Sequence, residues 1–153
     1  MFEGQHYQNG YITRDVESAI LQFRNRGGVD RVISFEGPVE VTTPKGHGLA
    51  VTKLAFIWIN NLQYELIQPV SGLVDIYSDE LPADESIKLH HVCMRVPEWD
   101  KFRDRADKMG FPVVLEGGND ALKFLYLDTR DFLGHYLEYV WMTPERWTAL
   151  GRG

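Results

Sequence analysis

The sequence has a single cysteine, Cys93, and no long apolar run. One cysteine excludes an intramolecular disulfide and a zinc site built from several thiolates. The longest apolar run, Leu54 to Ile59, is far too short to cross a bilayer, and residues 1–6 are too polar for a secretory signal peptide. We therefore expect a cytoplasmic protein with no membrane partner.

Positive charge is also scarce. Lys and Arg number 16 against 22 Asp and Glu, for a formal charge of −6, and no basic cluster offsets this excess, so we expect no nucleic-acid partner. Hydrophobic residues make up 44% and charged residues 25% of the 153 positions, close to the averages of globular proteins. A chain of this length buries a sizeable core. We expect one domain over residues 1–153, alone or as a homodimer.

Two stretches of the chain repeat one pattern at an offset of 83 residues, which places residues 8–17 on residues 91–100. In each copy a short strand leads to an acidic residue, Asp15 or Glu98, where a helix N-terminus favours negative charge. Apolar residues at helical spacing follow, which predicts a helix in each copy. These residues are Val16, Ala19, Ile20 and Phe23 in the first copy and Trp99, Phe102 and Ala106 in the second.

Each half continues with strand composition after its helix. The helices are predicted to end at Gly27 and Gly110, so each half is predicted as strand, helix and three strands. Module 1 covers about residues 5–70 and module 2 about residues 88–142, with a short C-terminal tail. Two such βαβββ modules would pair their sheets around a cavity, in an α+β fold. The strands predicted after the helices are Val32–Phe35, Val39–Thr42, Leu49–Ile59 and Leu62–Gln68, then Val113–Glu116, Phe124–Asp128 and His135–Trp141.

The segment of residues 36–44 is longer than a minimal βαβββ module requires. They include the predicted strand Val39–Thr42 and the residues on both sides of it. We expect this segment to be an insertion that borders the mouth of the cavity, where it would influence the choice of substrate.

Two glutamates lie inside otherwise apolar strands at corresponding ends of the two modules. They are Glu65, in the run Tyr-Glu-Leu-Ile, and Glu138, in the run Leu-Glu-Tyr-Val. Glutamate is depleted in strands and costly to bury unless it is paired. Either both face water from exposed edge strands, or they bind a divalent metal together with Gln8 and His91 from the opening strands. Side-chain alternation puts His90 on the mostly apolar face that packs beneath the helix and His91 on the opposite face, and alternation alone leaves open which face lines the cavity.

The arrangement resembles the vicinal oxygen chelate superfamily, the group of glyoxalase I, methylmalonyl-CoA epimerase and the extradiol dioxygenases, which is built from paired βαβββ modules. The resemblance covers about Gln5 to Trp141. In that family the metal ligands come from the first and last strands of each module, which implies the set Gln8, Glu65, His91 and Glu138. This set is similar to that of human-type glyoxalase I, whereas the whole chain is most similar to the epimerase-like branch. The stretches that carry the resemblance are residues 64–69, 89–96 and 134–139.

The resemblance implies a metal-dependent isomerase, epimerase or lyase. One divalent ion of Zn, Ni, Co, Mn or Fe would stabilise the negative oxygen that forms when a proton is removed next to a carbonyl. The expected substrate is a small molecule with vicinal oxygens or an acyl thioester. Glu138 is the first candidate for the base and Glu65 the second, with Glu36 and Glu40 as candidates outside the ligand set.

Two alternatives stay open. His6 lies two residues before Gln8, and a register slip of one pair would put it at the metal. With His91 and Glu138 it would form the two-histidine, one-carboxylate triad of an extradiol-type ring-cleavage dioxygenase that uses Fe(II). The second alternative is a non-catalytic small-molecule binding protein of the bleomycin-resistance kind.

Overall fold

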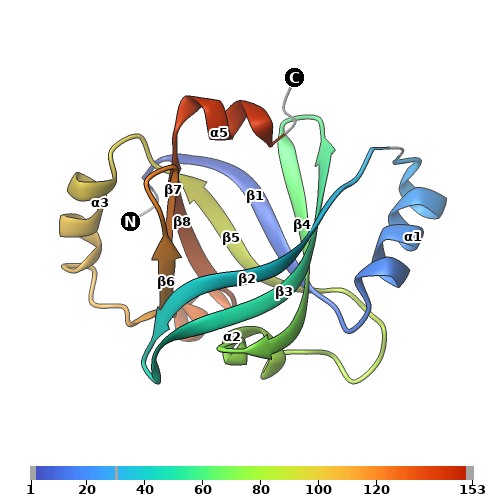
Figure 1. Cartoon of the computed structure of the whole chain (residues 1–153), viewed down its shortest axis with the longest axis horizontal. Coiled ribbons are helices and arrows are strands. Elements are labelled where there is room, and N and C mark those ends of the chain that lie inside the picture. The colour runs from blue at the N-terminus through green and yellow to red at the C-terminus, as the bar shows by residue number, and fades with distance from the viewer. Residues whose placement is uncertain (1–2, 30, 151–153) are drawn as a thin grey trace.

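A computed structural model describes residues 3–29 and 31–150 of the chain. Its elements are β1 (Gln5–Ile12), α1 (Val16–Gly27), β2 (Ile33–Thr43), β3 (Gly46–Ile59), β4 (Leu62–Gly72), α2 (Asp75–Ser78), β5 (Lys88–Arg95), α3 (Trp99–Ala106), β6 (Val113–Gly118), β7 (Leu122–Leu127), α4 (Arg130–Leu133), β8 (Tyr136–Met142) and α5 (Pro144–Ala149). The strands close into a barrel in the order β1-β4-β3-β2-β6-β7-β8-β5. The predicted α+β fold of two βαβββ modules is confirmed (Figure 1).

The two modules meet at two strand pairs, β1 with β5 and β2 with β6, both antiparallel. Within each module the first strand runs parallel to the last, β1 beside β4 and β5 beside β8. Gln8 pairs with Cys93 and Gly10 pairs with His91. Because Cys93 and His91 are the repeat equivalents of Gly10 and Gln8, the β1–β5 seam follows the local two-fold relation between the modules.

The two long helices lie on opposite outer sides of the barrel (Figure 1). Asp15 caps α1 by accepting hydrogen bonds from the backbone N–H groups of Glu17 and Ser18. Helix α1 ends at Gly27, as predicted, and the residue after it, Gly28, is left-handed with φ of 62°. In the second module α3 ends at Ala106, a turn earlier than the predicted Gly110, because the next residues form tighter turns.

The strand β2 is continuous, which corrects the predicted break between the strands Val32–Phe35 and Val39–Thr42. Its first part has a neighbour on one side only, since β2 pairs with β6 just at Val41 and Thr42. Pro38 therefore sits where its missing N–H costs no inter-strand hydrogen bond. The extra residues of module 1 are thus built into a long β2–β3 hairpin rather than into a loop.

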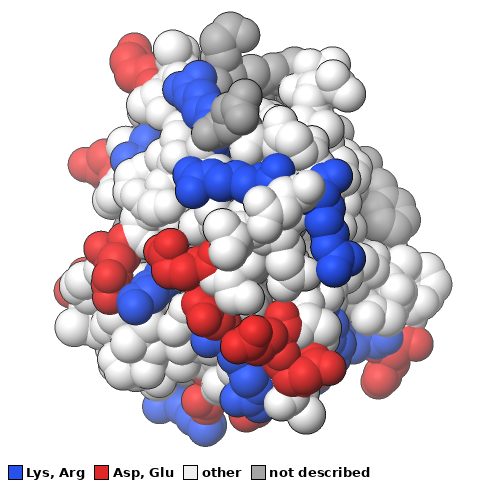
Figure 2. Space-filling view, turned by 90° about the vertical axis from the view of Figure 1, so that its right-hand side faces the viewer, with Lys and Arg blue, Asp and Glu red and all other residues white. Residues whose placement is uncertain are grey.

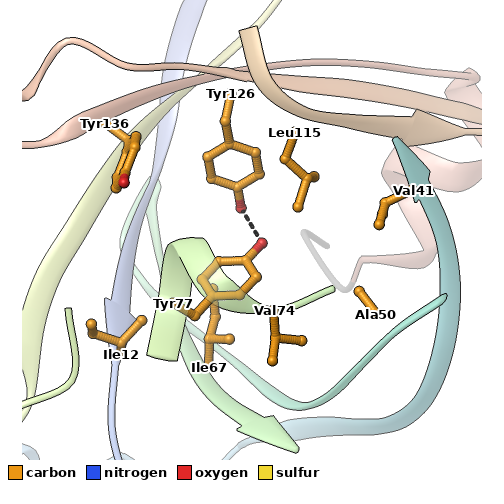
Figure 3. Packing of buried hydrophobic residues seen from close by; sticks show 9 residues of the cluster. All are labelled: Ile12, Val41, Ala50, Ile67, Val74, Tyr77, Leu115, Tyr126 and Tyr136. Carbon is orange, nitrogen blue, oxygen red and sulfur yellow. Dashed lines mark hydrogen bonds between the residues drawn. The ribbon is translucent and has the colours of Figure 1, made fainter. Parts of the chain in front are cut away.

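Apolar side chains fill both the outer faces of the barrel and its two ends. Val16, Ala19 and Ile20 of α1 are buried against β3 and β4, and Phe102 and Ala106 of α3 against β5, β7 and β8. Inside the barrel, α2 covers one end, where the Tyr77 hydroxyl donates to the Tyr126 hydroxyl at 3.0 Å (Figure 3). The helix α5 covers the opposite end (Figure 1), and its Trp147 packs on Tyr7 and Trp58. The interior between these two ends holds the candidate site.

Both signs of charge share the face shown in Figure 2, with several Lys and Arg side chains across its middle and upper part and a group of Asp and Glu below them, interspersed with further Lys and Arg. No helix within residues 3–29 and 31–150 is long and apolar enough to cross a membrane.

Candidate metal centre

The four predicted ligands come together inside the barrel, from the adjacent strands β4, β1, β5 and β8. The Nε2 atom of His91 lies 3.0 Å from Oε2 of Glu138 and 3.6 Å from Oε1 of Glu65. It lies 3.4 Å from Oε1 of Gln8. All four residues are buried, and both β4 and β8 are inner strands of the sheet. The interpretation of Glu65 and Glu138 as water-facing edge residues is therefore wrong.

A β-bulge in β1 separates His6 from this cluster. His6 pairs with Met94 and Gln8 with Cys93, so Tyr7 is left without a partner and the alternation of side chains shifts. His6 is exposed and shares a 2.7 Å hydrogen bond with Asn9, whereas Gln8 faces the interior. The structure thus places Gln8, and not His6, beside His91.

A second irregularity brings both histidines of β5 inside. Gly10 pairs with His91 and Tyr11 with Leu89, which leaves His90 as the extra residue on β5. The His90 ring packs on Tyr77, Tyr126 and Tyr136 rather than under α3. The predicted placement of His90 toward the helix is wrong, because alternation alone does not reveal a bulge.

Gly10 makes room for the His91 ring. A Cβ atom at this position would lie 1.9 Å from Cε1 of His91 and 2.3 Å from its Nε2. Only a residue without a side chain allows the imidazole to lie across β1, at the point where Gly10 also pairs with Glu65 of β4. The sequence of β1 therefore shapes the site through an absent side chain as well as through Gln8.

Gln63 fixes the orientation of the Gln8 amide. The Nε2 group of Gln8 donates to Oε1 of Gln63 at 2.7 Å and to Oε2 of Glu65 at 3.4 Å. Both N–H groups are thus directed at oxygens, and Oε1 of Gln8 is left facing His91. The buried Nε2 group of Gln63 itself has no hydrogen-bond partner, so this wall of the cluster also presents an unused donor.

Burial sets the charge state of the cluster. Desolvation raises the pKa of Glu65 well above its usual value, and the nearby Glu138 raises it further. Desolvation also raises the pKa of Glu138 to about 8, although hydrogen bonds with Cys93 and Tyr126 act in the opposite direction. Burial lowers the pKa of His91 to about 3. A neutral imidazole therefore faces carboxyl groups that are driven toward their protonated form.

The cluster suits a divalent cation by its chemistry. Three oxygens and one imidazole nitrogen converge, and this mixed set is compatible with Zn, Ni, Co, Mn or Fe. Two carboxyl groups buried together are costly without a positive charge to balance them. Within residues 3–29 and 31–150, no group of three or more His, Cys, Asp and Glu residues already has metal-binding geometry. Nε2 of His91 and Oε2 of Glu138, at 3.0 Å, would have to move apart to admit an ion between them. Metal binding by these residues is therefore a prediction.

Sequence reasoning missed several residues that contact the cluster. Tyr126 of β7 is hydrogen-bonded to Glu138, and the alternation of inward Phe124 and Tyr126 with outward leucines could have placed it inside. Tyr7 is buried beside Cys93 and Glu138, but no local pattern reveals it, because its inward position depends on the β1 bulge. Glu36 and Glu40, the outlying base candidates, are exposed residues of β2.

The inner wall of the barrel reaches solvent along the first part of β2. Phe35 and Val39 have the same strand parity as Val41, which is buried in the interior. Yet Phe35 is 49% and Val39 43% exposed. Phe35 packs on Phe56, with ring centroids 5.7 Å apart, and Phe56 pairs with Glu65. An apolar row therefore leads from solvent toward the carboxyl groups.

Comparison with known proteins assigns the family. The sequence profile of the Glyoxalase/Bleomycin resistance protein/Dioxygenase superfamily matches residues 7–126. The chain belongs to this superfamily. The match covers nearly all of module 1 and module 2 as far as residue 126, with all of the predicted ligands except Glu138, which lies beyond it on β8. The predicted resemblance to the vicinal oxygen chelate proteins is thus confirmed.

Solved structures share the fold at low sequence identity. Methylmalonyl-CoA epimerase from Mycobacterium tuberculosis has a TM-score of 0.63 and 16% identity, over 97% of each chain. A Streptomyces coelicolor methylmalonyl-CoA epimerase variant in complex with 2-nitronate-propionyl-CoA has a TM-score of 0.62 and 14% identity, over 92% of this chain and 96% of that one. A hypothetical protein from Bacillus halodurans has a TM-score of 0.61 and 13% identity, over 91% and 94%. No curated protein matches the chain.

Proposed function

We propose that this protein is a metal-dependent enzyme that removes a proton next to a carbonyl group, as an epimerase, isomerase or lyase. The observation that carries this proposal is the convergence of Gln8, Glu65 and Glu138 on Nε2 of His91 inside the barrel. These four side chains would hold one divalent ion. Bound there, the ion supplies a positive charge that stabilises the enolate oxygen left by proton removal.

Each residue of the site has a task that its surroundings support. Gln63 holds the Gln8 amide so that its oxygen faces the centre. Glu138 is the proposed base, and the hydrogen bonds from Cys93 and Tyr126 keep its carboxyl group in place. Glu65 is the second candidate, since it lies on the same side of His91 and receives one 3.4 Å hydrogen bond. Burial of all these groups keeps bulk water away from the reacting carbon.

The apolar row along the first part of β2 favours a substrate with an apolar portion beside its carbonyl. Phe35 and Phe56 form an aromatic surface that runs from solvent to Glu65. A small acyl thioester, or a compound with vicinal oxygens, places its carbonyl at the centre and its apolar carbons along this surface. The fold shared with methylmalonyl-CoA epimerases supports the acyl thioester first.

The test follows exchange of the proton next to the carbonyl. Methylmalonyl-CoA is incubated with the Co²⁺-loaded protein in D₂O, and loss of the C2 proton is followed by NMR. We expect exchange catalysed by the wild-type protein and a rate at least about 100-fold lower for Glu138→Gln. The matched control is Glu36→Gln, an exposed carboxylate of β2 that should leave the rate unchanged. Equal exchange by Glu138→Gln and the wild type would remove Glu138 from the mechanism.

The structure gives less support to the two alternatives. A dioxygenase triad needs a second imidazole at the metal, and His6 is exposed on the other side of β1. Among the described residues, a single imidazole nitrogen faces the two carboxyl groups. A non-catalytic binding protein would have no use for two buried carboxyl groups beside an imidazole. Oxygen consumption by the protein in the presence of Fe(II) and catechol would support the dioxygenase alternative.

A further inference from the structure

Two histidines form a continuous hydrogen-bonded chain behind the candidate centre. The Nε2 atom of His90 lies 2.8 Å from the backbone oxygen of Ile76, in α2. The Nδ1 atom of His90 lies 3.1 Å from Nδ1 of His91. On the other side of its ring, His91 presents Nε2 to the oxygens of Gln8, Glu65 and Glu138. The chain therefore runs from the helix that covers one end of the barrel to the candidate ligands.

The positions of the protons follow from which atoms accept. A backbone carbonyl only accepts hydrogen bonds, so Nε2 of His90 carries a hydrogen. His90 is buried next to a second imidazole and stays neutral, which leaves its Nδ1 with a lone pair. Nδ1 of His91 must then donate to it. A neutral His91 with a hydrogen on Nδ1 has its remaining lone pair on Nε2, directed at the cluster.

The opposite arrangement of protons is disfavoured. If His91 carried its hydrogen on Nε2, Nδ1 of His90 would have to donate to Nδ1 of His91. The lone pair on Nε2 of His90 would then face the Ile76 oxygen at 2.8 Å, which places two acceptors in contact inside a buried site. The favoured arrangement also sets a lone pair, on Nε2 of His91, against an oxygen that cannot donate, Oε1 of Gln8, but at the longer distance of 3.4 Å. The nearer Glu138 carboxyl group, at 3.0 Å, donates to this Nε2 when it is protonated. Three tyrosine rings, those of Tyr77, Tyr126 and Tyr136, pack on His90 and restrict any rotation that would relieve this contact.

We propose that His90 is a positioning residue that fixes His91 in the form with a hydrogen on Nδ1 and a free Nε2 directed at Gln8, Glu65 and Glu138. A metal binds an imidazole nitrogen only through its lone pair, so His90 prepares the ligand atom before any ion arrives. The same contact joins α2 to the site, because His90 is anchored on the Ile76 carbonyl. The proposed tautomer of His91 does not depend on the proposed function. The proposed effect of His90 on metal affinity does rest on the proposed function.

The first experiment reads the tautomer directly in the metal-free protein. Long-range ¹H–¹⁵N correlation spectra of histidine-labelled wild-type protein distinguish protonated from unprotonated ring nitrogens. We expect protonated Nδ1 and free Nε2 in His91, with the reverse in His90, and assignment uses the loss of one ring system in His91→Ala. A hydrogen on Nε2 of His91 in the wild type would overturn the proposal, whatever reaction the protein catalyses.

The second experiment measures Co²⁺ affinity by titration of the metal-free protein and two variants. His90→Phe keeps a ring of similar volume but cannot accept from His91, and we expect its affinity to fall by about 10- to 100-fold. His90→Asn places a carbonyl oxygen where Nδ1 was, and should stay within about 3-fold of the wild type. Unfolding curves without metal show whether both variants fold.

The outcomes separate the two proposals. Unchanged affinity in a folded His90→Phe would contradict the positioning role, and so would equal losses in the two His90 variants. If His91→Ala binds Co²⁺ as the wild type does, the proposed metal centre fails instead, and the spectra of the metal-free protein still decide the tautomer. Should His90→Phe fail to fold, the wild-type spectra and His90→Asn decide the proposal alone.

Discussion

The two modules contribute to the site from equivalent positions but with different chemistry. The opening strand of each module supplies one predicted metal ligand, the amide oxygen of Gln8 in module 1 and the imidazole of His91 in module 2. These two residues are 83 positions apart, which is the offset of the repeat. The last strand of each supplies a carboxyl group, Glu65 or Glu138. In module 1 the supporting residue is Gln63, whose Oε1 accepts one 2.7 Å hydrogen bond from Nε2 of Gln8.

Module 2 surrounds its two donors more completely. Glu138 is hydrogen-bonded with Cys93 and Tyr126, and His91 is backed by His90. At the seam, Gly10 of module 1 is the repeat equivalent of Cys93 and leaves the space that the His91 ring occupies. The repeat thus places the four predicted ligands at equivalent positions, whereas most of the contacts that support them come from module 2 and from a gap in module 1.

The largest expected effect is the loss of metal binding when module 2 donors are removed. His91→Ala and Glu138→Ala should each weaken Co²⁺ binding by more than about 100-fold, beyond the range typical of residues that only support a ligand. Gln8→Ala removes a neutral oxygen, and we expect a loss nearer about 10-fold. Metal titration and elemental analysis measure both. Full metal content in the Glu65→Ala and Glu138→Ala variants would contradict the metal centre.

Filling the gap in module 1 should affect the module 2 ligand almost as strongly. In Gly10→Ala the new methyl group would overlap the His91 ring, so the ring or the β1–β5 seam must move. We expect a loss of Co²⁺ affinity of about 10- to 100-fold and a decrease in the free energy of unfolding of about 1–3 kcal/mol. The control is Gly27→Ala, whose Cβ would meet only a Val29 methyl at 3.6 Å. Equal affinity in the two variants would show that His91 does not depend on the gap.

Replacing one carboxyl group should have opposite effects with and without metal. In Glu138→Gln the amide N–H can donate to Nε2 of His91, and the repulsion between two buried carboxyl groups disappears. We expect the metal-free variant to be as stable as the wild type or more stable, by up to about 1 kcal/mol. Metal at 100 times its Kd should stabilise the wild type by about 2.7 kcal/mol and the variant far less. Denaturant unfolding in EDTA and in Co²⁺ measures both effects. If Co²⁺ stabilises the wild type and Glu138→Gln by the same amount, Glu138 is not a metal ligand.

Much of this arrangement follows from residue patterns, and the parts that do not follow have a common cause. The 83-residue repeat and the two embedded glutamates are local patterns, so they predicted the modules and the strands that carry Glu65 and Glu138. The inward turn of His90 and the outward turn of His6 result from bulges in the β1–β5 pair. A bulge is a property of two strands far apart in the chain, and alternation within one strand does not contain it.

The same reasoning explains the error at β2. One glycine and two prolines in residues 36–44, namely Gly37, Pro38 and Pro44, suggest a break in the strand when they are taken alone. In the structure this part of β2 has a neighbour on one side only, so Pro38 is accommodated and the strand continues. The pairing of β2 with β6, which lies far from it in the sequence, decides which part of β2 lacks a second neighbour.

The smallest expected effect concerns the two helix N-termini, where the modules differ again. Asp15 accepts hydrogen bonds from two backbone N–H groups of α1, whereas Glu98 makes no such bond at α3 and instead pairs with the exposed Lys101 at 2.7 Å. Asp15→Ala should therefore lower the free energy of unfolding by about 1 kcal/mol, and Glu98→Ala by less than about 0.5 kcal/mol. Equal changes in denaturant unfolding would mean that the acidic residues act only through the helix dipole, which is the same at both sites. Neither variant should alter Co²⁺ affinity, because both helices lie on the outer sides of the barrel (Figure 1) and the four predicted ligands lie inside it.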